Sequence, residues 1–173
     1  MKSAISVLVA ALVLLVTLSP DTSARRQGAP ADGWRPIEGS WSASGQKRVL
    51  ATDVERMAST SYLSGALVLA GGAGTARGFQ SEVITFDDGA GISVGRAVWT
   101  DEHGDRIFSR LSGEGMRAGR RIAGTITGGT GRYAGVEGEY AFEWQYVIDA
   151  GDGTIQGRTV GLTGRFRVKG DGR

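Results

Sequence analysis

Hydrophobic and polar side chains alternate with a period of two along most of the chain after Trp34. In the clearest segment, Glu139–Ile148, one face carries the large apolar residues Tyr140, Phe142, Trp144, Tyr146 and Ile148. Strict alternation of this length is typical of a strand with one buried and one solvated face. No convincing helical period follows Trp34, so the sequence predicts an all-β domain.

Short segments rich in Asp and Gly separate the alternating segments and predict tight turns. One of them, Asp149–Gly153, precedes a last strand at about Thr154–Val168. Earlier strands are expected at Gln46–Met57, Ser61–Leu69, Gly78–Phe86, Ile92–Thr100, Arg106–Ser112 and Arg120–Thr127, and Ile37–Ser42 is a candidate for an additional short strand. About eight strands in sequence order predict a single antiparallel up-and-down barrel, whose closure removes the exposed sheet edges.

The beginning of the chain is expected to lie outside this domain. Lys2 precedes an apolar stretch from Ala4 to Leu18, and small residues follow at Thr22–Ala24, as in a secretory signal peptide. The stretch has about 15 residues, fewer than the roughly 20 of a membrane-spanning helix, so no stable span is expected. We therefore expect a signal peptide at residues 1–24, a flexible leader at 25–33, a barrel at 34–173 and a secreted or periplasmic location.

The amino-acid composition excludes several kinds of functional site. The chain holds 29 glycines, which suit the bends of a strongly curved sheet, and no cysteine. A net charge of +2, with dispersed basic residues, gives no sign of nucleic-acid binding. His103 is the only histidine, so neither a zinc site nor a serine triad is expected. The acidic loop Asp101–Asp105 has the oxygen ligands of a cation site, but a solvated hairpin tip is the favoured interpretation.

The most distinctive segment is Gly128–Gly135, which contains a glycine spacing found in dinucleotide-binding loops. That chemistry needs a helix after the loop, whereas Val136–Tyr140 has the pattern of a strand. No Gly-Lys-Ser/Thr follows, which also excludes a phosphate-binding P-loop. The segment is therefore interpreted as a tight loop between neighbouring strands.

The extended segment Ile126–Gly138 resembles the "GGTG-aromatic-x-G-x-x-G" signature of the dirigent and allene oxide cyclase barrel superfamily. The resemblance extends over about Ile37 to Val168. It implies an eight-stranded barrel with a central cavity that works without metal or organic cofactor. It also implies that the cavity holds a reactive small molecule and directs its cyclisation or radical coupling. The signature itself concerns a turn and its packing, and it assigns no catalytic residue.

Alternation indicates which residues face the cavity. If the apolar faces point inward, Tyr140, Trp144 and Tyr146 either line the lumen or simply fill the core. Three charged residues share a phase with apolar neighbours: Glu82, Arg96 and Arg158. Inside the barrel, an Arg–Glu pair would polarise a carbonyl or epoxide oxygen. The alternative is that these three lie at the barrel mouth or beyond a bulge that shifts the register.

Three functions are compatible with these sequence features. The leading hypothesis is a barrel that binds a small lipophilic molecule and steers its cyclisation or coupling without a cofactor. The second is a carrier or sensor that uses the same cavity without catalysis. The third is a filled barrel whose loops bind a protein partner; the fold alone does not decide among them, nor whether the chain forms homo-oligomers.

Overall fold

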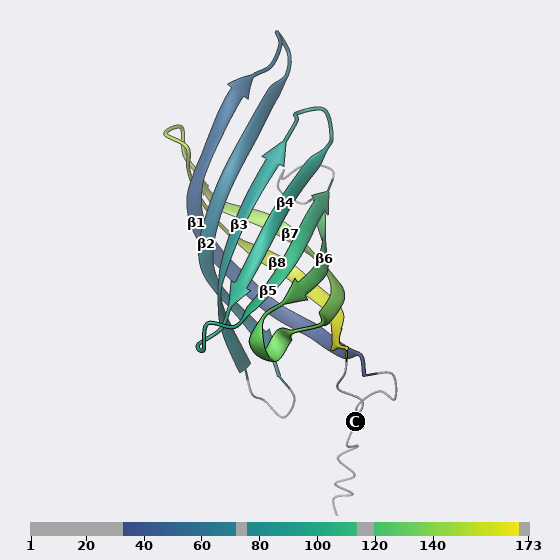
Figure 1. Ribbon diagram of the computed structural model, residues 1–173. Coiled ribbons are helices and arrows are strands. Elements are labelled where there is room, and N and C mark those ends of the chain that lie inside the picture. The colour runs from purple at the N-terminus through teal and green to yellow at the C-terminus, as the bar shows by residue number, and fades with distance from the viewer. Residues whose placement is uncertain (1–32, 72–75, 114–119, 170–173) are drawn as a thin grey trace, which may run out of the picture.

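Eight strands follow one another in sequence order around a closed antiparallel barrel (Figure 1). The structure, a computed structural model, describes residues 33–71, 76–113 and 120–169. Its strands are β1 (Arg35–Ala51), β2 (Met57–Ala70), β3 (Ala76–Asp87), β4 (Ser93–Thr100), β5 (Arg106–Gly113), β6 (Arg121–Gly129), β7 (Val136–Asp149) and β8 (Thr154–Val168). One 3-10 turn, η2 (Gly131–Tyr133), lies between β6 and β7. The predicted all-β, up-and-down barrel is confirmed.

The expected signal peptide at 1–24 and the leader up to residue 32 lie outside the described residues. Within the described part of the chain, no helix is long and apolar enough to span a membrane.

The first strand is longer than the sequence pattern suggested. Two separate strands were expected at Ile37–Ser42 and Gln46–Met57, but β1 runs continuously through the first and most of the second, ending at Ala51, and Met57 already begins β2. The turn after β1 comes at Thr52–Arg56, because the Asp53 carboxylate accepts the backbone N–H groups of Glu55 and Arg56 at 2.8 and 2.9 Å. A register shift against β8 between Gly39 and Ser42 bends β1 without ending it.

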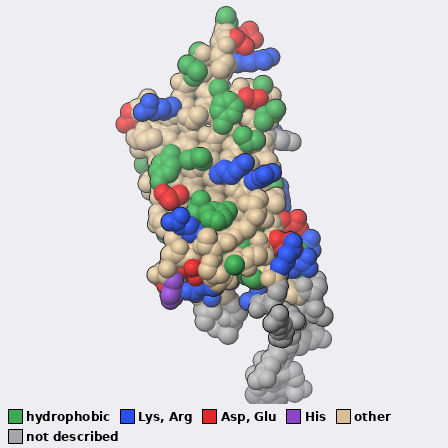
Figure 2. All heavy atoms as spheres, in the orientation of Figure 1, with side chains coloured by type: hydrophobic (Ala, Val, Ile, Leu, Met, Phe, Trp, Pro, Cys, Tyr) green, Lys and Arg blue, Asp and Glu red, His purple; other side chains and the backbone are tan. Residues whose placement is uncertain are grey.

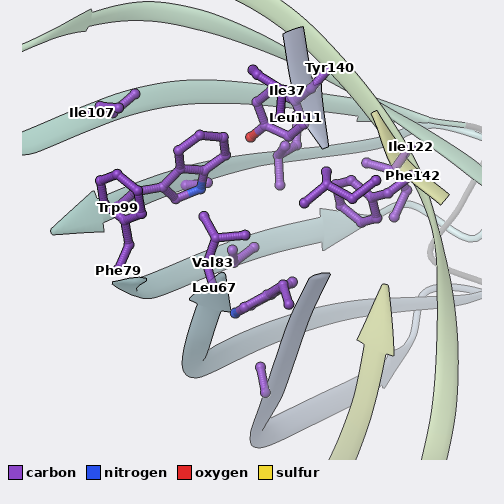
Figure 3. Packing of buried hydrophobic residues seen from close by; sticks show 14 of the residues in the cluster. Ile37, Leu67, Phe79, Val83, Trp99, Ile107, Leu111, Ile122, Tyr140 and Phe142 are labelled. Carbon is purple, nitrogen blue, oxygen red and sulfur yellow. The ribbon is translucent and has the colours of Figure 1, made fainter. Parts of the chain in front are cut away.

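The two ends of the barrel differ. We call the end with the β1–β2 turn the upper end, where this hairpin extends beyond the other strands (Figure 1). The opposite, lower end carries the β4–β5 turn and η2. Between the ends, inward side chains from all eight strands form one hydrophobic core, in which the labelled rings of Trp99, Tyr140 and Phe142 converge (Figure 3).

Candidate functional site

The aromatic face of β7 points into the barrel. Trp144 is fully buried, Tyr140 is buried, and Tyr146 is half-buried at the upper end. Trp144 contacts Tyr146 edge-on, with ring centroids 6.0 Å apart, and Trp41 of β1 on its other side at 5.1 Å. All three residues expected from β7 are thus inside, and their role in ligand binding stays a prediction.

The expected lumen position of Glu82, Arg96 and Arg158 is wrong, because all three side chains are exposed on the outside. Glu82 accepts a hydrogen bond from the Tyr62 hydroxyl at 2.6 Å, and the Arg158 guanidinium donates to Gln145 Oε1 at 3.0 Å.

Next to each of these charged residues, a small residue faces the interior, because bulky aromatic rings already fill the barrel. Gly157, beside Arg158, has no room for a side chain, since a Cβ there would lie 2.5 Å from Trp144 Cζ2. On β3, Ser81 is buried, whereas Ile84, in phase with Glu82, is 56% exposed. A barrel of this size has room for large side chains on some strands only if others contribute small ones.

A small cavity lies in the middle of the barrel. Its volume is about 20 Å³, enough for about one water molecule and far below the roughly 300 Å³ or more of typical ligand pockets. It is lined mainly by apolar and aromatic residues: Trp41, Leu67, Ser81, Val83, Ala97, Trp99, Leu111, Tyr140, Phe142, Thr159 and Leu162. The large central cavity implied by the family resemblance is therefore replaced here by a packed aromatic interior.

Two buried indole N–H groups inside the barrel have no hydrogen-bond partner among the described residues: Trp41 Nε1 and Trp144 Nε1. A buried donor without an acceptor costs roughly 1–3 kcal/mol. The backbone N–H of Trp41, in contrast, has a partner, since it donates to Thr159 Oγ1 at 2.9 Å where the β1–β8 ladder shifts register. The unpaired indole N–H groups can therefore donate hydrogen bonds to an oxygen atom placed in this region.

Tyr140 is the one titratable residue among those that line the cavity. Burial raises the pKa of its hydroxyl well above the usual range, and the nearby Ser109 hydroxyl offsets this only in part. Tyr140 therefore remains a neutral hydroxyl at ordinary pH. The lining offers neutral hydrogen-bond donors and no charged side chain.

At the upper end, Lys47 and Tyr146 lie over the interior. The Lys47 ammonium forms an ion pair with Asp149 and lies 5.6 Å from the centroid of the Tyr146 ring. Burial raises the pKa of Tyr146, and the nearby charges of Asp149 and Asp87 raise it further. Among the described residues, the side chains of Lys47 and Tyr146 thus lie between Trp144 and the upper end.

The lower end is closed by the glycine-rich loop. Tyr133 of η2 is buried against Phe79, with ring centroids 5.9 Å apart. Arg132 Nε lies 3.3 Å from carboxylate oxygens of both Asp101 and Asp105, which ties η2 to the β4–β5 turn. Gly131 is required here, because its φ is +52° and a Cβ would lie 1.8 Å from Asp105 Oδ1. The segment is the tight loop that the sequence predicted.

The acidic loop Asp101–Asp105 helps to close the lower end of the barrel. Asp101 Oδ1 accepts the backbone N–H groups of His103 and Asp105 at 2.8 and 3.1 Å. In the part of the chain that the structure describes, no group of three or more acidic or histidine side chains is arranged to hold a metal ion.

Sequence reasoning missed Trp41 and Trp99, which supply much of the cavity wall. Both alternate in phase with small inward residues, Trp41 with Ala43 and Trp99 with Ala97. The sequence did contain a signal for the inward position of these tryptophans, since a tryptophan and an alanine two positions apart are compatible with one buried face. Each alternating segment was too short for this signal to be recognised.

Comparisons with known proteins give only distant likenesses. No protein-family model matches the chain, and no curated protein matches it. Among solved structures, it is similar to a pyocyanin demethylase, with a TM-score of 0.46 and 16% identity over 73% of this chain and 98% of that one. It is also similar to a pterocarpan synthase dirigent protein, with a TM-score of 0.46 and 12% identity over 89% of this chain and all of that one (100%).

Proposed function

We propose that the barrel binds a small, flat, largely apolar molecule that carries one oxygen acceptor. The observation that carries this proposal is the pair of buried indole N–H groups without an acceptor, on Trp41 and Trp144. A core that served only for packing would place phenylalanine there and avoid the cost of an unpaired donor. Aromatic walls at Trp41, Trp99 and Phe142 suit the faces of a flat molecule.

Binding requires the cavity to enlarge from its volume of about 20 Å³. The lower end is held by Tyr133 and the Arg132 ion pairs, so the upper end is the part that opens. The side chains of Lys47 and Tyr146 lie at this end, and their displacement would uncover Trp144 beneath them.

The finer proposal is that the barrel steers the cyclisation or coupling of its ligand in an exported protein. The Trp41 N–H and the neutral Tyr140 hydroxyl are donors that stabilise negative charge on an oxygen without taking part in proton transfer. Shape and desolvation would supply the rest. Any such activity would survive Glu82→Gln, Arg96→Gln and Arg158→Gln, because those residues lie outside the barrel.

One alternative is supported by a specific observation. The cavity volume is that of a filled core, which favours a barrel that acts through its outer surface. Under this alternative the two indole N–H groups would bind at most a water molecule.

Native mass spectrometry and tryptophan fluorescence distinguish the two functions. The first experiment asks whether a small molecule co-purifies with the protein from its own host. The second titrates the protein with flavone, a flat apolar ketone, and with its carbonyl-free analogue flavan. Binding of flavone that weakens about tenfold or more in Trp41→Phe, while binding of flavan weakens less, supports the proposal. This variant removes the indole N–H together with one of the two fused rings, and flavan reports the loss of the ring alone. No ligand in the mass spectrum and no response to either probe would establish the filled barrel.

A further inference from the structure

Two arginines face each other on the outside of the barrel. Arg96 on β4 and Arg110 on β5 are direct cross-strand partners, and both side chains are exposed. Like charges directly opposite each other destabilise a sheet. Arg96 Nη1 donates to the backbone oxygen of Gly95 at 2.9 Å, but no carboxylate of the described residues lies within ion-pair distance of either guanidinium. Within the described ranges, the pair therefore lacks a counter-charge.

The same face also carries exposed apolar side chains. Tyr62, Ile84, Phe86 and Val94 are 46, 56, 46 and 44% exposed. The strand register makes them neighbours of the arginine pair, because Tyr62 pairs with Ile84, and Ile84 in turn pairs with Arg96. Figure 2 looks onto this face, where hydrophobic and basic side chains lie close together.

The apolar surface continues to the upper end. The β3–β4 turn packs against the start of β2, since a Cβ on Gly89 would lie 2.2 Å from the Met57 oxygen. Exposed Met57 and Ile92, at 55 and 62%, extend the surface across this contact. We call Tyr62, Ile84, Phe86, Val94, Ile92 and Met57, together with Arg96 and Arg110, the basic–apolar face.

We propose that the basic–apolar face binds the surface of an anionic lipid bilayer. Such a surface offers phosphates for the two guanidiniums and an apolar region for the adjacent aliphatic and aromatic side chains. An anionic polysaccharide would use the arginines but leave the apolar residues in water. A second copy of the chain would bring Glu82, which already accepts the Tyr62 hydroxyl, and Asp88 of the β3–β4 turn, which already accepts the backbone N–H groups of Ala90 and Ile92.

The test is co-sedimentation of the full chain with vesicles of phosphatidylcholine alone and with added phosphatidylglycerol. The apolar stretch Ala4–Leu18 is common to every variant, so the informative quantity is the difference between variants. Arg96→Gln and Arg110→Gln should each weaken binding to the anionic vesicles about fivefold. Phe86→Ser should weaken it as well. The matched control is Arg158→Gln on β8, which removes the same charge away from this face and should leave binding unchanged.

Three results would overturn the proposal. The first is equal binding to neutral and anionic vesicles, and the second is an equal loss in Arg158→Gln. The third is an oligomer in analytical ultracentrifugation that Phe86→Ser dissociates, because a second copy would then cover the face. Circular dichroism of each variant checks that the barrel is folded.

Discussion

The ring of Tyr140 lies directly against Gly124, its cross-strand partner on β6, so that a Cβ on Gly124 would be 2.2 Å from Tyr140 Cζ. The glycine leaves space for a ring that also contacts Trp99, with centroids 4.9 Å apart. Gly124→Ala should therefore displace Tyr140 and lower the free energy of unfolding by about 1–3 kcal/mol. Chemical denaturation followed by circular dichroism measures this change.

Gly78→Ala is the matched control for this prediction. Gly78 lies in β3 with ordinary backbone angles, and a Cβ there meets nothing within 4 Å. The free energy of unfolding should change by less than about 0.5 kcal/mol. Equal losses for both substitutions would show that backbone conformation, rather than the contact with Tyr140, makes Gly124 necessary.

The packing of large rings against small residues explains why the sequence predicted the strands but not every inner face. Alternation identified the strands and their order, and on β7 it also identified the inner face, because the other face carries Glu139 and Glu143. On β3 both faces mix large and small residues, and the inner one is Phe79, Ser81, Val83 and Thr85. Which face points inward there depends on the volume that rings from distant strands occupy, and a single sequence does not contain that information.

Bulges account for another part of what the sequence did not reveal. Val160 and Leu162 have the same phase in the sequence, yet Val160 is 45% exposed and Leu162 is buried. The β7–β8 register shifts between Ala141 and Glu143, and Gly161 has a φ of +63°. Arg158 therefore belongs to the outer face with Val160, which is the bulge alternative that the sequence left open.

The carboxylate of Asp101 should make the lower end sensitive to acid. Burial opposes its ionisation, but hydrogen bonds from the His103 and Asp105 N–H groups and the Tyr133 hydroxyl, together with the Arg132 charge, lower its pKa below 3.8. A lowered pKa in the folded state adds stability above the unfolded value of 3.8, and that stability disappears as the pH falls through the folded value.

Asp101→Asn should therefore be less stable than the parent at pH 7, with a difference that shrinks as the pH falls below about 3.8. Thermal unfolding at a series of pH values measures this difference. Glu102→Gln on the same turn is the control, because its side chain is 65% exposed. A difference that stayed constant through the acid range would assign the effect of Asp101→Asn to shape rather than to charge.

Tyr140 should limit stability at alkaline pH. Burial raises the pKa of its hydroxyl in the folded state, so the stability from the neutral form is complete below the unfolded value of 10.0 and is lost as the pH rises above it. Tyr140→Phe cannot ionise, and its stability should fall less steeply above pH 10 than that of the parent. Unfolding curves across this range test the prediction, and parallel decreases in both proteins would contradict it.

The side chains at the upper end should control access to the interior tryptophans. Trp41, Trp99 and Trp144 are 4, 4 and 0% exposed, and Lys47 and Tyr146 lie on the upper side of Trp144.

In a Trp34→Phe background, which removes the tryptophan outside the barrel, acrylamide should quench fluorescence weakly. Lys47→Ala removes the ion pair with Asp149, and quenching should then increase about twofold or more, because Tyr146 loses its covering partner. Lys169→Ala at the lower end likewise removes a lysine–carboxylate ion pair, with Glu137, and should leave quenching unchanged. An equal increase in both variants would mean that the barrel loosens as a whole, and the upper end would then have no special part in admitting a ligand.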